Sequence, residues 1–137
     1  MNIKKSNSKG FTLIELLIVI IIIGILAAIA FVAYSGSQNK AKKADAQSTV
    51  SQVKTKLGEY NADNSMYPDN KAAVVTWLKS AAGGNNTALG DKFNDAGYEY
   101  TPGSCSSGTN CQTFELEAKG TLFGGQDNDT DNIKVTN

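Results

Sequence analysis

The sequence has no histidine and no arginine, and only two cysteines in 137 residues. Without histidine, a serine or cysteine nucleophile has no imidazole base, and zinc sites that use histidine are excluded. No glycine-rich phosphate loop is present, since Gly83-Gly84 and Gly124-Gly125 are typical of turns. We therefore expect a protein that is not an enzyme, with no catalytic residue and no obligatory cofactor.

The charges are balanced overall but unevenly placed. All 13 positive residues are lysines, and they match 13 acidic residues. Residues 1–10 hold three lysines and no acid, whereas the chain after Tyr60 holds five lysines and ten acids, a net charge of −5. Because nonspecific nucleic-acid binding depends on Lys and Arg at phosphates, we expect no direct contact with nucleic acid.

Residues 11–34 form a long apolar segment. As a helix they span about 36 Å, enough to cross a bilayer. The preceding lysines predict a cytoplasmic N-terminus, which places the rest of the chain outside. Glu15 interrupts this segment, and a charge at the centre of such a helix costs about 2.5–3.5 kcal/mol, which marks it as functional. Gly24 has two readings: close helix packing, or a place where the helix melts.

The helix is predicted to continue beyond the membrane segment, because residues 35–60 keep one apolar stripe. We expect one helix of about fifty residues, from Phe11 to near Tyr60, whose second part covers a globular core. The stripe residues are spaced by four and three: Ala46, Val50, Val53, Leu57 and Tyr60.

The remaining residues predict a small mixed region. Residues 61–70 read as a loop, and Asp69 or Asn70 is the expected N-cap of a short helix that ends at Gly83-Gly84. Residues 83–97 read as loop. Period-2 alternation then predicts three strands, which form an antiparallel sheet on the helix stripe in an α+β fold. The strands are expected around 98–100, 114–118 and 133–135.

Two smaller patterns each allow a functional interpretation and one without function. Outside the cell, Cys105 and Cys111 are expected to form a disulfide, the alternative being two free thiols. The alternating carboxylates of Asp127, Asp129 and Asp131 suit an oxygen-preferring cation such as Ca²⁺, although the EF-hand glycine and glutamate are missing. The alternative is a solvated acidic turn.

Residues 10–16, GFTLIEL, lie after a lysine-rich leader and open the apolar run. This motif resembles the class III leader and N-terminal helix of type IV pilins and pseudopilins. The similarity continues, less tightly, to Pro68 and covers about half of the chain. Beyond residue 70 only the general plan is similar, a small sheet with a disulfide-bounded loop. The implied fold is pilin-like: a transmembrane and then amphipathic helix packed on a small antiparallel sheet.

The resemblance implies a processing and assembly pathway. The prepilin peptidase removes residues 1–10 by cleavage after Gly10 and methylates the new N-terminal Phe11. Residues 11–34 then hold the subunit in the membrane until an assembly platform and a cytoplasmic ATPase add it to a helical homo-oligomeric filament. Residues 35–60 continue the helix and 61–137 form the exported region. The mature filament would lie on the cell surface and serve adhesion, motility or attachment.

Glu15 matches the family position that guides assembly, where it would meet the Phe11 amine of a neighbouring subunit. Many relatives carry a proline where this chain has Val32, which predicts a straighter helix here. The alternative within the family is a pseudopilin of a type II secretion or DNA-uptake machine. The alternative outside it is a membrane-tethered binding module or enzyme, against which the Gly10, Phe11 and Glu15 pattern argues.

Overall fold

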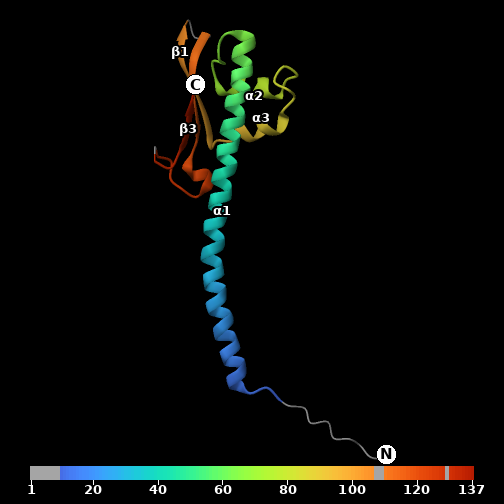
Figure 1. Cartoon of the computed structure of the whole chain (residues 1–137), viewed down its shortest axis with the longest axis vertical. Helices are drawn as coiled ribbons and strands as arrows, with labels where there is room; N and C mark the ends of the chain where they lie inside the picture. The colour runs from blue at the N-terminus through green and yellow to red at the C-terminus, as the bar shows by residue number, and fades with distance from the viewer. Residues whose placement is uncertain (1–9, 107–109, 129) are drawn as a thin grey trace, which may run out of the picture. The chain divides into compact units, whose positions relative to one another are not determined.

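The computed structural model describes residues 10–106, 110–128 and 130–137. By their contacts, the residues divide into two compact units, Met1–Ser37 and Gln38–Asn137, and helix α1 contributes to both. The elements are coloured along the chain in Figure 1, in the order α1 (Leu13–Asn64), α2 (Lys71–Lys79), α3 (Thr87–Phe93), β1 (Tyr98–Ser106), β2 (Asn110–Ala118), the 3-10 helix η1 (Gly120–Phe123) and β3 (Ile133–Thr136).

In the first unit, α1 is apolar on every side. The large apolar side chains of this segment, from Phe11 just before the helix to Tyr34, are 46% to 89% exposed. Within the described residues, α1 is the one helix long and apolar enough to cross a membrane. The backbone stays helical through residues 24–33, in agreement with the absence of proline at Val32. A helix that is apolar all round needs a nonaqueous environment, so lipid or other helices must cover this segment.

In the second unit, one face of α1 forms the floor of the core, as the stripe predicted. Ala46, Val50, Val53 and Leu57 are at most 1% exposed. Tyr60 lies at the margin and packs edge-on against Trp77, with ring centroids 5.3 Å apart. The core is completed by side chains from the other elements, among them Val74, Leu78, Leu89, Phe93, Tyr98, Phe114 and Leu116.

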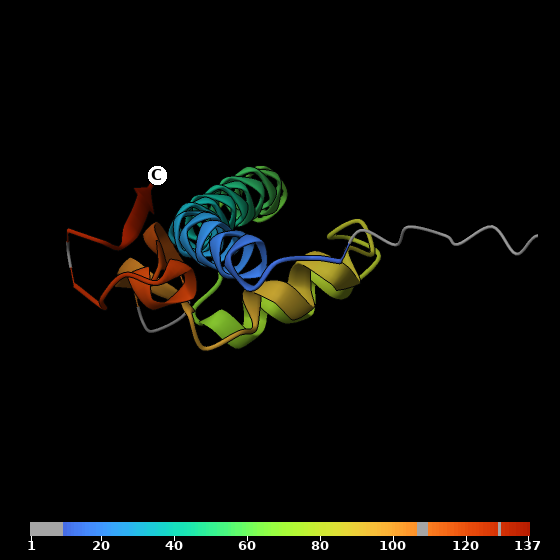
Figure 2. The ribbon, with the colours of Figure 1, turned by 90° about the horizontal axis from the view of Figure 1, so that it is seen from below.

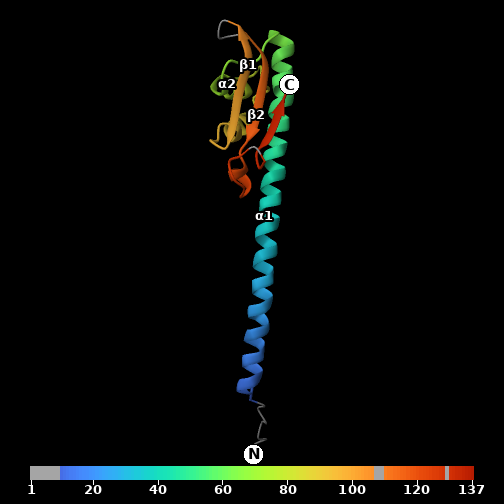
Figure 3. The same ribbon diagram turned by 90° about the vertical axis from the view of Figure 1, so that its left-hand side faces the viewer.

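The three strands form one antiparallel sheet in the order β1-β2-β3, and in Figure 3 they run alongside the part of α1 that belongs to this unit. Tyr98 lies opposite Ala118, and Leu116 lies opposite Val135. Leu116 and Ala118 are fully buried, while Glu117 between them lies on the other face of the sheet. The predicted α+β fold, a long helix packed on a small antiparallel sheet, is confirmed.

Helix α1 extends further than expected. The predicted loop at 61–70 is wrong for residues 61–64, which are helical, and the turn begins at Ser65. Ser65 has a left-handed φ of 57° and donates its backbone N–H to the carbonyl of Asn61. Pro68 restricts only the residue before it, so it does not stop a helix four residues upstream.

Helix α2 begins as predicted and ends earlier. The side chain of Asn70 accepts a hydrogen bond from the backbone N–H of Ala73 at 2.8 Å, which makes it the N-cap. The helix stops at Lys79 rather than at Gly83-Gly84. Gly83 instead folds back against the helix, where an added Cβ would lie 2.0 Å from the carbonyl oxygen of Trp77.

The expected loop at 83–97 is wrong for residues 87–93, which form α3. Asn86 caps this helix by accepting from the backbone N–H of Leu89 at 3.1 Å. Leu89 and Phe93, one turn apart, are both buried in the core. Burial of these two side chains stabilises a helix too short to persist alone. Figure 2, seen along α1, shows α2 and α3 running beside each other.

The β1–β2 hairpin carries the predicted disulfide between Cys105 and Cys111, which lie opposite each other in the sheet. Cys111 is fully buried, and its carbonyl accepts a hydrogen bond of 2.8 Å from the backbone N–H of Tyr67. The bridge therefore fixes the hairpin end next to the turn that follows α1. Residues 107–109, at the tip, lie outside the described residues.

Lys71 ties α2 to the start of the sheet. Its ammonium group donates to the backbone carbonyls of Asn94, Asp95 and Tyr98 at 3.4, 2.8 and 2.6 Å. It also lies 5.5 Å from the ring centre of Phe93. Burial lowers the pKa of Lys71, while the carboxylates of Asp95 and Glu99 act in the opposite direction. One cation thus satisfies three carbonyls at the junction of α3 and β1.

Lys71→Met should lower the free energy of unfolding by about 1–3 kcal/mol, because three carbonyls lose a charged donor. Urea unfolding of the detergent-solubilised chain, followed by the fluorescence of the single tryptophan, Trp77, measures this. Lys40→Met is the matched control, since Lys40 is exposed on α1. Equal midpoints for the two variants would contradict the assigned role.

Reduction of the disulfide should lower the free energy of unfolding by about 2 kcal/mol, the value expected for so short a closed loop. The same fluorescence assay, with and without reductant, measures the change. A double variant, Cys105→Ser with Cys111→Ser, should match the reduced protein and ignore reductant. A reductant effect of equal size in that variant would show that the bridge is not its cause.

Candidate functional site

The first candidate site lies at the start of α1. Gly10 and Phe11 precede the helix, in backbone without regular structure, and both are exposed. Apart from Gly10 and its chain neighbours, no atom of the described residues lies within 4 Å of the position that a Cβ on Gly10 would take. Among the described residues, nothing therefore covers the predicted cleavage bond between Gly10 and Phe11. Residues 1–9 of the predicted leader lie outside the described residues.

Glu15 belongs to a reciprocal cap with Thr12. Glu15 Oε2 accepts from the backbone N–H of Thr12 at 2.9 Å and from its hydroxyl at 2.7 Å. In return, the backbone N–H of Glu15 donates to the Thr12 hydroxyl at 3.3 Å. This is the T-x-x-E capping box, a signal present in the sequence that the prediction of Glu15 as an assembly residue did not use.

The cap occupies one oxygen of the Glu15 carboxylate. Both bonds from Thr12 end on Oε2, and Oε1 makes no hydrogen bond within the described residues. A carboxylate can accept about four hydrogen bonds, so Glu15 retains acceptor capacity in an apolar segment. Such an oxygen can receive a charged donor from another molecule.

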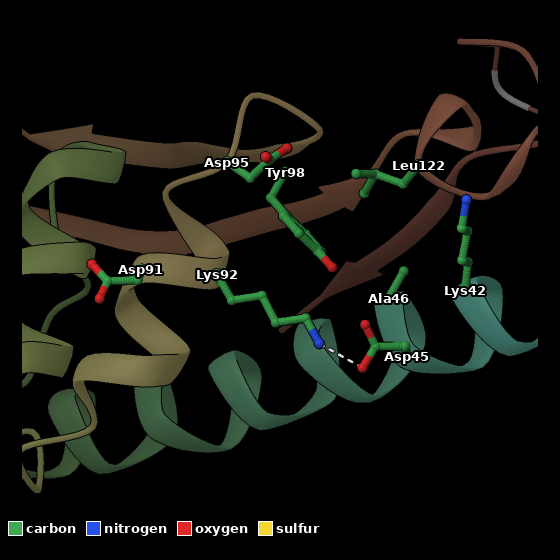
Figure 4. Close-up of a pocket in the computed structure, with 8 residues that line it drawn as sticks. All are labelled: Lys42, Asp45, Ala46, Asp91, Lys92, Asp95, Tyr98 and Leu122. Atoms are coloured by element: carbon green, nitrogen blue, oxygen red, sulfur yellow. Dashed lines mark hydrogen bonds and ion pairs between the residues drawn. The ribbon is translucent and has the colours of Figure 1, made fainter.

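The second candidate site is a cleft of about 320 Å³ in the second unit, drawn in Figure 4. Its floor is α1, its walls are α3 and the start of β1, and η1 contributes an apolar edge. Tyr98 is only 4% exposed, and its hydroxyl points into the cleft. The lining side chains are Lys42, Asp45, Ala46, Asp91, Lys92, Asp95, Tyr98 and Leu122.

Most charges around the cleft are already paired. Lys92 forms an ion pair with Asp45, and Asp91 pairs with Lys79 outside the cleft. Asp95 accepts from the backbone N–H of Gly97 at 2.8 Å and interacts electrostatically with Lys71. Of its lining residues, Lys42 and the Tyr98 hydroxyl can donate hydrogen bonds to a ligand.

The carboxylates predicted to bind calcium are only partly described, because Asp129 lies outside the described residues. Asp127 contacts the Asn132 amide and the Lys119 ammonium, and these two donors lower its pKa. Asp131 Oδ2 accepts from the backbone N–H of Gln126 at 3.0 Å. Within the described residues no three acidic side chains gather as metal ligands. Calcium binding stays a prediction.

Replacing Thr12 tests the cap independently of any assembly. Thr12→Ala removes the hydroxyl, which donates to Glu15 Oε2 and accepts from the backbone N–H of Glu15. Its loss should destabilise the first turn by about 1 kcal/mol and speed amide exchange at Glu15 about fivefold. Hydrogen exchange followed by NMR in detergent micelles measures this. Thr12→Ser keeps the hydroxyl and should exchange like the unaltered chain. Equal exchange in the two variants would contradict the cap.

Comparison with known proteins gives one match. Residues 5–31 match the family described as the prokaryotic N-terminal methylation motif, a pilin-type structural motif and not an enzyme family. No curated protein and no solved structure matches the chain. The matched residues include Gly10, Phe11 and Glu15. Residues 5–31 therefore carry the class III leader of type IV pilins, and the motif supports a type IV pilin- or pseudopilin-like precursor.

Proposed function

We propose that this chain is a structural subunit of a type IV pilus-like filament on the cell surface, cleaved after Gly10, methylated at Phe11 and assembled through α1. Adhesion, motility or attachment would be the filament's role. The observation that carries the proposal is the open Oε1 of Glu15, at the start of a helix whose apolar side chains up to Tyr34 are exposed all round. A plain membrane anchor needs the apolar surface but has no use for the carboxylate.

The apolar surface suits two environments in turn. In the membrane, lipid covers the segment from Phe11 to Tyr34, and in a filament the same side chains contact neighbouring copies of α1. Lipid is as apolar as these side chains, so burial alone gives only a small free-energy difference between the membrane and the filament. A polar interaction that exists in the filament but not in the isolated subunit would supply the preference.

Glu15 is suited to supply that interaction. After cleavage, Phe11 begins the chain with a positive amine, and the Thr12 cap still holds Oε2 of Glu15. The amine of a second copy can then bind Oε1. A buried charge without its partner is strongly destabilising, so a subunit added out of register would leave both charges unpaired. The carboxylate would thus select the correct axial register.

Glu15→Gln removes the charge but keeps the cap, because glutamine at this position also completes a capping box. We expect Glu15→Gln to insert and be cleaved but to give no filaments, since it cannot pair with the amine. Filaments sheared from cells expressing the variant, compared with the protein in their membranes, measure this. Glu15→Asp keeps the charge and should retain more assembly than Glu15→Gln. Normal filaments from Glu15→Gln would refute the proposed role of the charge.

The composition of the sheared filaments tests the processing and the role in the filament. Mass spectrometry should find a dominant N-terminal peptide that begins with N-methylated Phe11. Gly10→Lys should block cleavage and leave the precursor in the membrane. If the mature chain is abundant in membranes but missing from surface filaments, the chain is instead a pseudopilin of a secretion or DNA-uptake machine.

A further inference from the structure

We propose that the cleft in Figure 4 binds the Asp63 side chain of a second copy of this chain, so that Lys42 of one subunit pairs with Asp63 of the next. The inference rests on the proposed function, since it concerns contacts within the filament. It assigns a contact between exported units, separate from the contact at Glu15.

The cleft offers an unpaired donor set for a carboxylate. Within the described residues, the Lys42 side chain makes no ion pair or hydrogen bond, and the Tyr98 hydroxyl makes no hydrogen bond. The other lining charges are engaged, as Lys92 with Asp45 and Asp91 with Lys79. The Tyr98 ring is buried while its hydroxyl reaches the cleft, where it can donate to a ligand in place of water.

Of the charges that line the cleft, Lys42 is the one without a partner within the described residues, so it is the group that an anion would bind. Lys40 and Lys43 are two and one positions from Lys42 on α1, so their side chains leave the helix in other directions. Lys43 lies 5.5 Å from the Phe123 ring centre, and among the described residues no acid is paired with Lys40 or Lys42. An incoming carboxylate would therefore pair with Lys42.

Asp63 is the matching group at the other end of the exported part of α1. It is exposed in the last turn of the helix, where there is no basic residue. A carboxylate near a helix C-terminus is unfavourable, because the helix dipole is negative at that end. The neighbouring acids have partners: Glu59 pairs with Lys56, and Asp69 accepts from the Asn70 amide at 2.8 Å. Within the described residues the Asp63 side chain has none.

The two groups are placed for head-to-tail stacking. Lys42 and Asp63 are 21 positions apart on one helix, which corresponds to about 32 Å along its axis. A contact that joins different surfaces of identical subunits does not close on itself in general, and it generates a helical filament. The pair therefore predicts that subunits related by about 32 Å along the filament axis touch through this contact.

Charge reversal tests the pairing in the full-length chain. Lys42→Glu and Asp63→Lys should each lower the yield of sheared filaments about tenfold, because each places like charges together, and the double variant should recover to within about twofold of the unaltered chain. Yields are normalised to mature protein in the membrane. Lys40→Glu is the matched control, on the same turn but outside the cleft, and should assemble normally.

Asp63→Lys distinguishes loss of the contact from unfolding of the subunit. A cation at a helix C-terminus stabilises the helix, so a fall in filament yield with this variant does not report unfolding. Tyr98→Phe removes only the hydroxyl, and its filaments should dissociate at a lower temperature than the unaltered ones. Failure of the double variant to recover, or an equal loss with Lys40→Glu, overturns the pairing. If filaments form normally with Lys42→Glu but not with Glu15→Gln, this inference fails and the proposed function stands.

Discussion

The apolar surface of α1 from Phe11 to Tyr34 is the constraint on which the rest depends. Its large apolar side chains are 46% to 89% exposed, and water is an unfavourable solvent for so large a contiguous patch. The segment therefore needs lipid or other helices around it. Everything that distinguishes a filament from a membrane anchor has to come from the few polar groups at the edges of that surface.

Glu15 and Thr12 show how one such group is tolerated. The capping box satisfies Oε2 of the carboxylate and two backbone N–H groups of the first helical turn. These bonds reduce the penalty of placing a charge next to hydrocarbon without neutralising it. The remaining oxygen, Oε1, can still accept a hydrogen bond from a cation. The same local motif thus starts the helix and keeps the acceptor available for a partner.

The elements with strong periodicity could be predicted from the sequence, and those that depend on tertiary contacts could not. The stripe at Ala46, Val50 and Leu57 and the alternation around Leu116 define their own buried faces. Helix α3 has seven residues in a stretch rich in glycine and asparagine, and its stability comes from Leu89 and Phe93 in the core. The cleft was not predictable, because Lys42, Tyr98 and Leu122 meet only through the fold.

The positions of the charges bear on assembly only once the chain is folded. A net charge of zero says nothing about assembly, yet Lys42 lies near the start of the part of α1 that belongs to the second unit, and Asp63 lies at its end. Within one rigid helix these groups cannot reach each other. In the contact proposed above, their attraction is satisfied between copies, and it is directional, since each copy has one end of each sign. A stack of such units continues from either end, as a filament requires.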